Sequence, residues 1–280
     1  MFGIIDVGGG TRDIFGAGVL DYCMDHGVMT DAFIGVSAGT ANGMAYLAGQ
    51  RGRNYRFYQD YEFRQEYMGI LALLKTGSWA NLDYIYSTLS NEDGEDPLDY
   101  DAFERNPSTF DVVATDAETG KPVYFTRADL SRNHYDVLKA SSCVPVFCRP
   151  YPIQGRRYFD GGISDPIPLR YARQKGVDRL AIILTRPRDG FRTSGRDDKM
   201  VRLLRHRFPQ AARAMHQRAE TYNASLREAH QGEAEGWIKI IAPEDISGLR
   251  TLTRDHEKLE ALYQEGYRKG EGLAAFYREE

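Results

Sequence analysis

The sequence predicts an α/β fold built on parallel strands. Apolar runs over residues 2–7 and 32–36 have strand character, and each leads through a glycine-containing turn into a helical pattern, over residues 14–26 and 38–47. A third run, over residues 179–185, is apolar almost throughout, as is typical of a strand buried on both faces. Because right-handed crossovers make such strands parallel, their loops meet at the sheet edge where ligands bind in open α/β sheets.

The rest of the chain alternates in the same way. We expect helices over 135–141, 169–175, 200–230 and 256–277, strands over 110–116, 122–126 and 237–241, a hairpin over 151–158 and an aromatic-rich helical region over 51–100. No internal repeat or long linker divides the chain. We therefore expect a single domain over residues 1–280, with a core over about 3–185 and helical and strand additions over 186–280.

Composition excludes several classes of protein. The 280 residues are 42% hydrophobic and 27% charged, as in soluble globular proteins. A net charge of −4 provides no basic field for nucleic acid, and no apolar run is long enough to span a membrane. The N-terminal apolar run lacks a basic leader, so we expect a cytoplasmic protein. Cys23, Cys143 and Cys148 lack metal-site spacing, which indicates buried thiols, and nothing in the sequence indicates a metal or cofactor.

The stretch Gly35-Val36-Ser37-Ala38-Gly39 joins a predicted strand to a predicted helix. Glycines at 35 and 39 suit a turn too tight for side chains, which would expose the Ser37 hydroxyl at the N-terminus of the helix. A nucleophilic serine needs a base. Histidines downstream stand in helical or surface contexts that do not point them at a site: His206, His216, His230 and His256.

A carboxylate is the other candidate for the base. Asp160 is followed by Gly161 and Gly162, which let the backbone pack closely and leave the carboxylate at a loop tip. The alternative interpretation of Asp-Gly-Gly is an ordinary hairpin turn.

The loop Gly8-Gly9-Gly10 lies between a predicted strand and a predicted helix. Its amides can supply the N–H donors that acyl transfer needs for an oxyanion, and Arg12 adds positive charge nearby or is an ordinary surface arginine. A dinucleotide-binding loop would require glycine at position 13, where the chain has Asp13, and a Walker A loop would require Gly-Lys-Ser/Thr. The loop therefore fits an oxyanion better than a nucleotide.

These motifs, in this order, resemble those of the patatin-like phospholipases, in particular the small bacterial stand-alone members. The resemblance covers about residues 3–185 and rests on the segments Gly8 to Arg12, Gly35 to Gly39, Ala114 to Asp116, Gly120 to Val123, Ala140 to Ser142 with Pro145, Asp160 to Gly162, and Asp165 to Pro168. It implies a three-layer α/β/α sandwich with a mainly parallel central sheet. It also implies hydrolysis of lipid acyl esters by a Ser37–Asp160 dyad without histidine, with the oxyanion held at the glycine loop, best by Gly9 and Gly10.

The chain departs from the family pattern at Asp13, where the loop usually carries its last glycine. An aspartate side chain facing the site would oppose an oxyanion, whereas one capping the following helix would be harmless. Two alternatives to the dyad enzyme stay open. One is a catalytically impaired lipid-binding or regulatory module, and the other is an esterase with a histidine-containing triad.

Contact with a membrane is a further expectation. Residues Arg186 to Phe208 hold eight Lys and Arg against three Asp, beside an apolar stripe of Met200, Leu203, Leu204 and Phe208. Such a segment can dock on anionic lipid. The alternative interpretation is a helix packed on the core with a solvated arginine face.

Overall fold

A central sheet with helices on both faces organises the chain. The computed structural model describes residues 1–193, 195 and 197–279. In this part of the chain the strands are β1 (Phe2–Asp6), β2 (Ala32–Val36), β3 (Thr109–Asp116), β4 (Pro122–Thr126), β5 (Tyr151–Ile153), β6 (Arg156–Asp160), β7 (Arg179–Ile183) and β8 (Ile238–Ile241). The α-helices are α1 (Ile14–Asp25), α2 (Ala38–Leu47), α3 (Arg53–Gln59), α4 (Ile70–Thr76), α5 (Tyr100–Arg105), α6 (Asp136–Ser141), α7 (Leu169–Gln174), α8 (Asp198–Leu204), α9 (Pro209–Ala234) and α10 (His256–Arg278).

The sheet has the order β5-β6-β3-β2-β1-β7-β8, with β4 paired to β3 beside this path. The strands from β3 through β2, β1 and β7 to β8 are mutually parallel, while β4, β5 and β6 pair antiparallel. Every residue of β1 and β2 is buried, as expected for strands covered on both faces. The predicted three-layer α/β/α fold with a mainly parallel sheet is confirmed.

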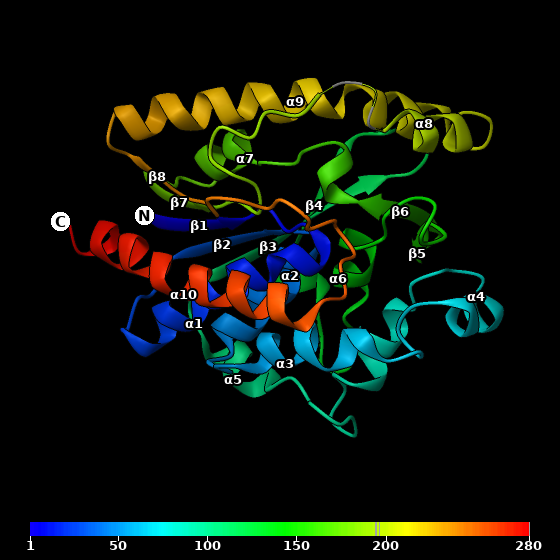
Figure 1. Ribbon diagram of the computed structural model, residues 1–280, viewed down its shortest axis with the longest axis horizontal. Coiled ribbons are helices and arrows are strands. Elements are labelled where there is room, and N and C mark those ends of the chain that lie inside the picture. Colours follow the sequence, from blue (N-terminus) through cyan, green and yellow to red (C-terminus); the bar gives the residue numbers. More distant parts are fainter. Residues whose placement is uncertain (194, 196, 280) are drawn as a thin grey trace.

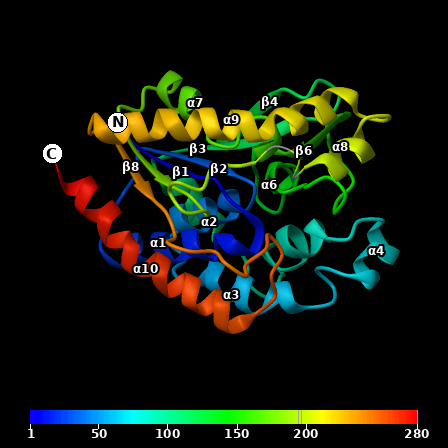
Figure 2. The ribbon, with the colours of Figure 1, turned by 45° about the horizontal axis from the view of Figure 1, so that its top comes forward.

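Helices form the two outer layers. In Figures 1 and 2, α7, α8 and α9 cover one face of the sheet, and α1, α2, α3 and α10 cover the other. Successive strand residues supply the two cores: Ile4 packs into the core that contains Phe15 of α1, and Ile5 into the core that contains Leu226 of α9. None of the helices in the described ranges is both long and apolar enough to cross a bilayer.

Two expected elements differ from the structure. The predicted helix over 200–230 is two helices, α8 and α9, because Pro209 lacks an amide hydrogen and begins a new helix at its first position. The region 51–100 is helical only in short pieces, and its acidic stretch before α5 is irregular. The aromatic residues of this region pack into the core between separate short elements, and they do not form one face of a continuous helix.

Candidate active site

Ser37 occupies a strained turn between β2 and α2. Its backbone has φ 57° and ψ −129°, values that L-residues rarely adopt. A Cβ at Gly39 would lie 2.4 Å from the carbonyl oxygen of Asp6, so only glycine permits this close approach to β1. The Ser37 amide donates a 2.8 Å hydrogen bond to the Ser141 hydroxyl, which itself donates to the Val113 carbonyl. These contacts fix the turn while the Ser37 side chain lines a pocket.

Asp160 ends β6 and is 4% exposed. Its carboxylate accepts a 2.8 Å hydrogen bond from the Gly162 amide, and the Ser37 side chain is near enough to lower its pKa. Burial raises the pKa of Asp160, while the Arg218 guanidinium and the Ser37 side chain oppose that rise. The antiparallel pairing of β6 with β3 places Asp160 opposite Ala114, beside the end of β2. The structure thus brings the two predicted residues together.

The glycine loop lies directly beside this turn. Its three residues all have positive φ (64°, 151° and 63°), and a Cβ at Gly8 would lie 2.2 Å from the Val36 carbonyl oxygen. The Gly8 amide donates to a carboxylate oxygen of Asp6 at 3.1 Å, so it is not available to a ligand. The amides of Gly9 and Gly10 have no hydrogen-bond partner among the described residues. Of the three loop amides, these two are therefore free to donate a hydrogen bond to a ligand, and Gly10 lines the same pocket as Ser37.

The side chain of Asp13 takes neither of the two expected positions. It makes no capping hydrogen bond to α1, and it is fully buried against the carboxyl group of Asp6. Burial and the neighbouring Asp6 raise the pKa of Asp13 well above its ordinary value, and burial raises the pKa of Asp6 to about 6. Both oxygens of the Asp13 carboxyl group are buried without a hydrogen-bond partner among the described residues, a setting that disfavours the charged form. The departure from the family pattern thus places a carboxyl pair beneath the glycine loop, behind the Gly8 amide.

Arg12 lies under the loop rather than on the surface. It is 5% exposed, and its Nε donates to the Gly9 carbonyl at 3.5 Å. Burial and the nearby Arg186 lower the pKa of Arg12 to about 10. It belongs to an arginine cluster, defined here as Arg12, Arg186, Arg192 and Arg218.

Sequence analysis missed the contribution of α9 to this cluster. Arg218 of α9 donates from Nε to the Gly162 carbonyl at 2.6 Å, and Arg192 stacks over the ring of Tyr222 of α9 with its Cζ 5.1 Å from the centroid. Nothing in the helical pattern of residues 200–230 distinguishes Arg218 from the other arginines of that stretch, because its neighbour Gly162 is distant in sequence.

The four downstream histidines make their contacts away from Ser37. His256 stacks on Phe63 and bonds to Gln59, and His230 bonds to the Arg188 carbonyl. His206 contacts the neighbouring Arg205, and His216 is exposed on α9. Across the described residues, no hydrogen bond or ion pair joins any of them to Ser37 or Asp160.

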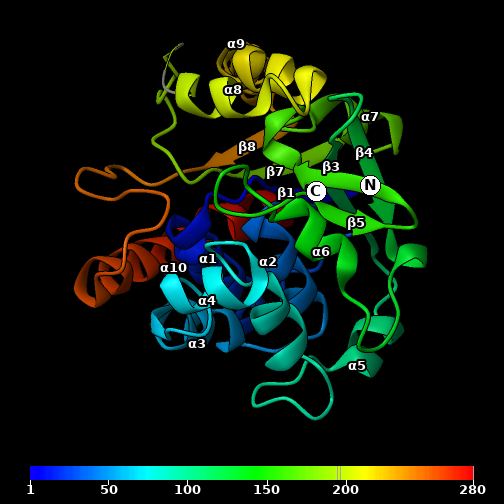
Figure 3. The same cartoon turned by 90° about the vertical axis from the view of Figure 1, so that its right-hand side faces the viewer.

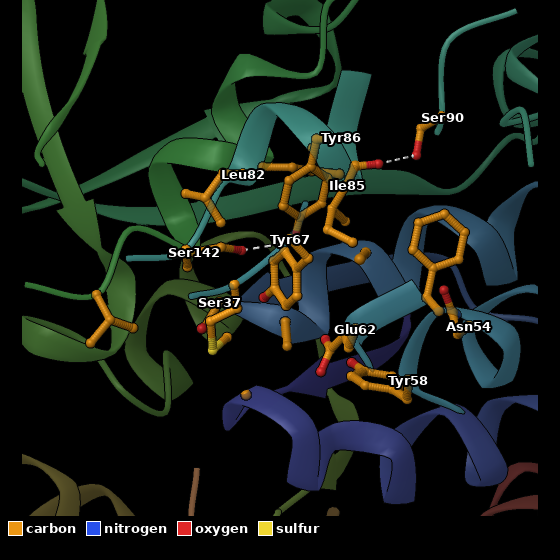
Figure 4. Close-up of a pocket in the computed structure, with 18 of the residues that line it drawn as sticks. Ser37, Asn54, Tyr58, Glu62, Tyr67, Leu82, Ile85, Tyr86, Ser90 and Ser142 are labelled. Atoms are coloured by element: carbon orange, nitrogen blue, oxygen red, sulfur yellow. Dashed lines mark hydrogen bonds between the residues drawn. The ribbon is translucent and has the colours of Figure 1, made fainter. Parts of the chain in front are cut away.

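A deep pocket opens beside Ser37 (Figure 4). It encloses about 1040 Å³ of space free of protein atoms, part of it open to solvent. Its walls are mostly apolar and include Met44, Phe57, Leu82, Ile85, Leu138 and Phe147. Figure 4 shows Ser37, Tyr67 and Glu62 around the same space. The Oε2 atom of Glu62 is buried without a hydrogen-bond partner among the described residues, and burial raises the pKa of Glu62 to about 8.

Comparisons with known proteins identify the class. The sequence model of the patatin-like phospholipases matches residues 7–173, more than half of the chain, and the chain therefore belongs to that family. That family is named for phospholipases, which hydrolyse lipid esters. A second family model, a domain of unknown function named DUF6363, matches residues 208–277, which contain α9, β8 and all but the last residue of α10.

Individual relatives are similar over parts of their length. The chain is 32% identical over 202 residues to the uncharacterized protein YjjU of Escherichia coli K12, a match that spans 70% of this chain and 55% of YjjU. An uncharacterized NTE family protein of Mycobacterium tuberculosis is 38% identical over 68 residues, which are 24% of this chain and 18% of that protein. The chain thus spans about half the length of YjjU. Among solved structures, VipD from Legionella pneumophila aligns with a TM-score of 0.49 and 16% identity, over 98% of this chain and 67% of VipD.

Proposed function

We propose that this protein is a serine acyl hydrolase that cleaves carboxylic esters of lipids, as a phospholipase A, lysophospholipase or lipid esterase, through a Ser37–Asp160 dyad. The observation that carries the proposal is the proximity of the buried Asp160 carboxylate to Ser37, which lies at a strained turn that faces an apolar pocket. Desolvation makes the Asp160 carboxylate a stronger base than an exposed aspartate.

The chemical steps follow from this geometry. Asp160 accepts the hydroxyl proton as Ser37 Oγ attacks the ester carbonyl carbon, and the resulting oxyanion receives hydrogen bonds from the Gly9 and Gly10 amides. The ester C–O bond then breaks, and Asp160 returns the proton to the departing alcohol. Water, deprotonated by Asp160, attacks the acyl-enzyme, and the proton passes to Ser37 as the fatty acid leaves.

The positions of particular residues argue against the two alternatives, a catalytically impaired module and a histidine-containing triad. Catalytic impairment by Asp13 would require its carboxylate to face the oxyanion, whereas it faces Asp6. A triad would require one of the four histidines near Ser37, and each of them makes its contacts elsewhere.

The test is hydrolysis of fatty-acyl esters by the wild-type chain, Ser37→Ala and Asp160→Asn. We expect Ser37→Ala to abolish turnover and labelling by a fluorophosphonate, and Asp160→Asn to slow turnover by about 10²–10⁴-fold, the usual contribution of a general base. Full activity in either variant would refute the dyad. Absence of labelling in the folded wild-type protein would favour the binding module, and loss of activity on mutating one histidine, with Asp160 dispensable, would favour the triad.

We also propose that the segment 186–208 contacts anionic lipid at the periphery of a membrane. On and after α8, Arg202, Arg205 and Arg207 are exposed, and Leu203 is 65% exposed. Leu204 and Phe208 of the expected apolar stripe are buried in the core, so the basic residues support this contact more than the stripe does. Arg196, counted among the basic residues of the segment, lies outside the described residues. Unchanged co-sedimentation with anionic liposomes after charge reversal at Arg202 and Arg205 would rule the contact out.

A further inference from the structure

Exposed apolar side chains gather on one protrusion. Among the described residues, the large apolar side chains that are at least two-fifths exposed outside it are few and scattered, such as Met29 and Phe191. Those on the protrusion come from α4, the residues after it and one neighbouring turn: Ile70 (66% exposed), Leu71 (44%), Leu73 (41%), Leu74 (78%), Trp79 (40%) and Val146 (54%). We call this set the α4 surface. An apolar cluster of this kind on a water-soluble fold marks an interaction site.

The protrusion is built into the fold. An antiparallel bridge joins Met68 to Ala80 at its base, and the Gly69 amide donates to the Trp79 carbonyl at 3.0 Å. The Trp79 amide in turn donates to the Phe147 carbonyl at 2.7 Å, which ties the α4 segment to the turn that carries Val146. Figures 1 and 2 show α4 projecting from the body of the molecule, and in Figure 3 it faces the viewer. The exposed residues are therefore held in place.

Val146, on the same surface, combines two unfavourable features: a strained backbone conformation and an exposed apolar side chain. Its φ is 78°, a conformation that is unfavourable for a β-branched residue and that glycine or asparagine would adopt more easily. The chain nevertheless has valine there, with more than half of its side chain exposed. Both the strain and the exposure are unfavourable in water, and contact with an apolar phase would offset the second.

The base of the protrusion is the wall of the pocket. Met68, Ala80 and Phe147, which make the bridge and the hydrogen bonds described above, line the pocket together with Ser37. The α4 surface is thus continuous with the apolar space beside the candidate nucleophile. A long acyl chain that enters from this side would stay in apolar surroundings.

Charge around the α4 surface suits phosphate-bearing lipid. Residues 67–82 contain no aspartate or glutamate, and they include Lys75 in the last turn of α4. Arg149 packs against Gly77, where an added Cβ would lie 2.5 Å from its Cζ. The exposed basic residues of α8 lie at the same end of the molecule as α4 (Figures 1 and 2). Basic side chains beside an apolar tip are typical of surfaces that insert into a bilayer interface.

We propose that the α4 surface inserts into the interface of a phospholipid bilayer and leads lipid into the pocket beside Ser37. The occupant is a lipid surface rather than a second copy of the chain, because a stable protein dimer needs about 800 Å² from each partner, more than one projecting two-turn helix offers. The inference rests on the proposed function for its purpose, but membrane binding can be measured without hydrolysis.

The test uses a background of Ser37→Ala, which keeps vesicle lipid intact, with Trp237→Phe, which leaves Trp79 as the single tryptophan of the two in the chain. We expect vesicles of phosphatidylcholine and phosphatidylglycerol to shift the Trp79 emission to the blue. Ile70→Glu with Leu74→Glu is expected to lower vesicle affinity at least tenfold, because each substitution places a charge where an apolar side chain inserts. Met29→Glu, at an exposed apolar residue away from α4, is the matched control and should bind as the parent does.

Activity provides the second readout. With Ser37 present, the double Glu variant should lower the ratio of the rate on vesicle lipid to the rate on a short soluble ester, and Met29→Glu should not. Absence of a blue shift, or equal vesicle affinity of the double variant and Met29→Glu, would overturn the proposal. A dimer in light scattering that the double variant abolishes would also overturn it, in favour of a contact between copies. Vesicle binding without hydrolysis of any ester would refute the proposed function alone.

Discussion

Ser37 lies between two regions of different chemical character, an apolar pocket and a cluster of arginines. On the face of the sheet that carries α2 and α3, it borders the apolar pocket, whose polar groups are few. On the face that carries α9, Arg218 reaches Gly162 beside Asp160, and Arg12 reaches Gly9. The first surroundings favour a hydrocarbon chain, and the second favour a polar or anionic group. An ester bond at Ser37 would lie at the boundary, with its acyl chain in the pocket and its alcohol toward the arginine cluster.

Among changes on the two sides of Ser37, filling the pocket should have the largest effect. Ala41, in the first turn of α2, is partly exposed and lines the pocket. Ala41→Phe would remove room for about four methylene groups, each worth about 0.8 kcal/mol on burial, so kcat/KM for long-chain esters should fall by about 200-fold. Short-chain esters, measured on the same variant, serve as the control. An equal loss on both substrates would mean that the pocket does not hold the acyl chain.

The arginine cluster should set the pH range of activity. Arg218 is the first of the groups that keep the pKa of Asp160 from rising further, and the base form of Asp160 is lost as pH falls through that pKa. In Arg218→Met the pKa of Asp160 should rise further, so the acid limb of kcat/KM should move to higher pH. Arg213→Met, at an exposed position of the same helix, is the control. A limb that stays in place would show that the cluster does not act on Asp160.

Local motifs made one part of this site predictable. Tight turns at Ser37 and Asp160 need glycine at fixed positions, and the order of strands and helices places both turns near one edge of the sheet. The structure brings these residues together as expected, while their chemical roles stay predictions. The prediction for Gly8 needs correction: its amide was expected to donate to the oxyanion, but it already donates to the Asp6 carboxylate.

The remaining features depend on contacts between distant segments. The position of Asp13 follows from contacts with Asp6 of β1 and Asn42 of α2, which no local pattern encodes, so neither expected orientation was correct. Arg218 approaches Gly162 only because α9 crosses the sheet. The separation of α8 from α9 did have a local signal in Pro209, which the apolar and basic pattern around it obscured.

The carboxyl pair of Asp6 and Asp13, beneath the glycine loop, should lower the stability of the folded protein at alkaline pH. The pKa values of Asp6 and Asp13 are both raised, so the folded state holds more protons than the unfolded state, and stability falls as pH rises through these values. Asp13→Asn keeps a hydrogen-bond donor toward Asp6 at every pH. We expect its melting temperature to exceed that of the wild type by several degrees at pH 9 and to match it near pH 5. If the melting temperatures of the two proteins change with pH in parallel across this range, the pKa of Asp13 is not raised in the folded state.

The smallest expected effect is at Glu62, a carboxyl group that lines the mostly apolar pocket. Burial raises the pKa of Glu62 to about 8, although Arg254 opposes the rise, so the group is neutral in the folded state at pH 7. Its contribution to stability is complete below its unfolded pKa and is lost as pH rises toward 8. Glu62→Gln is neutral at every pH, so it should be more stable than the wild type at pH 9, by less than Asp13→Asn because Glu62 faces an open pocket and not a second carboxyl. The same variant should retain long-chain activity above pH 8, where the wild type places a charge among apolar walls. If the wild type and Glu62→Gln lose activity equally above pH 8, on long-chain and short-chain esters alike, Glu62 stays neutral in that range. The apolar character of the pocket would then not depend on the proton of Glu62.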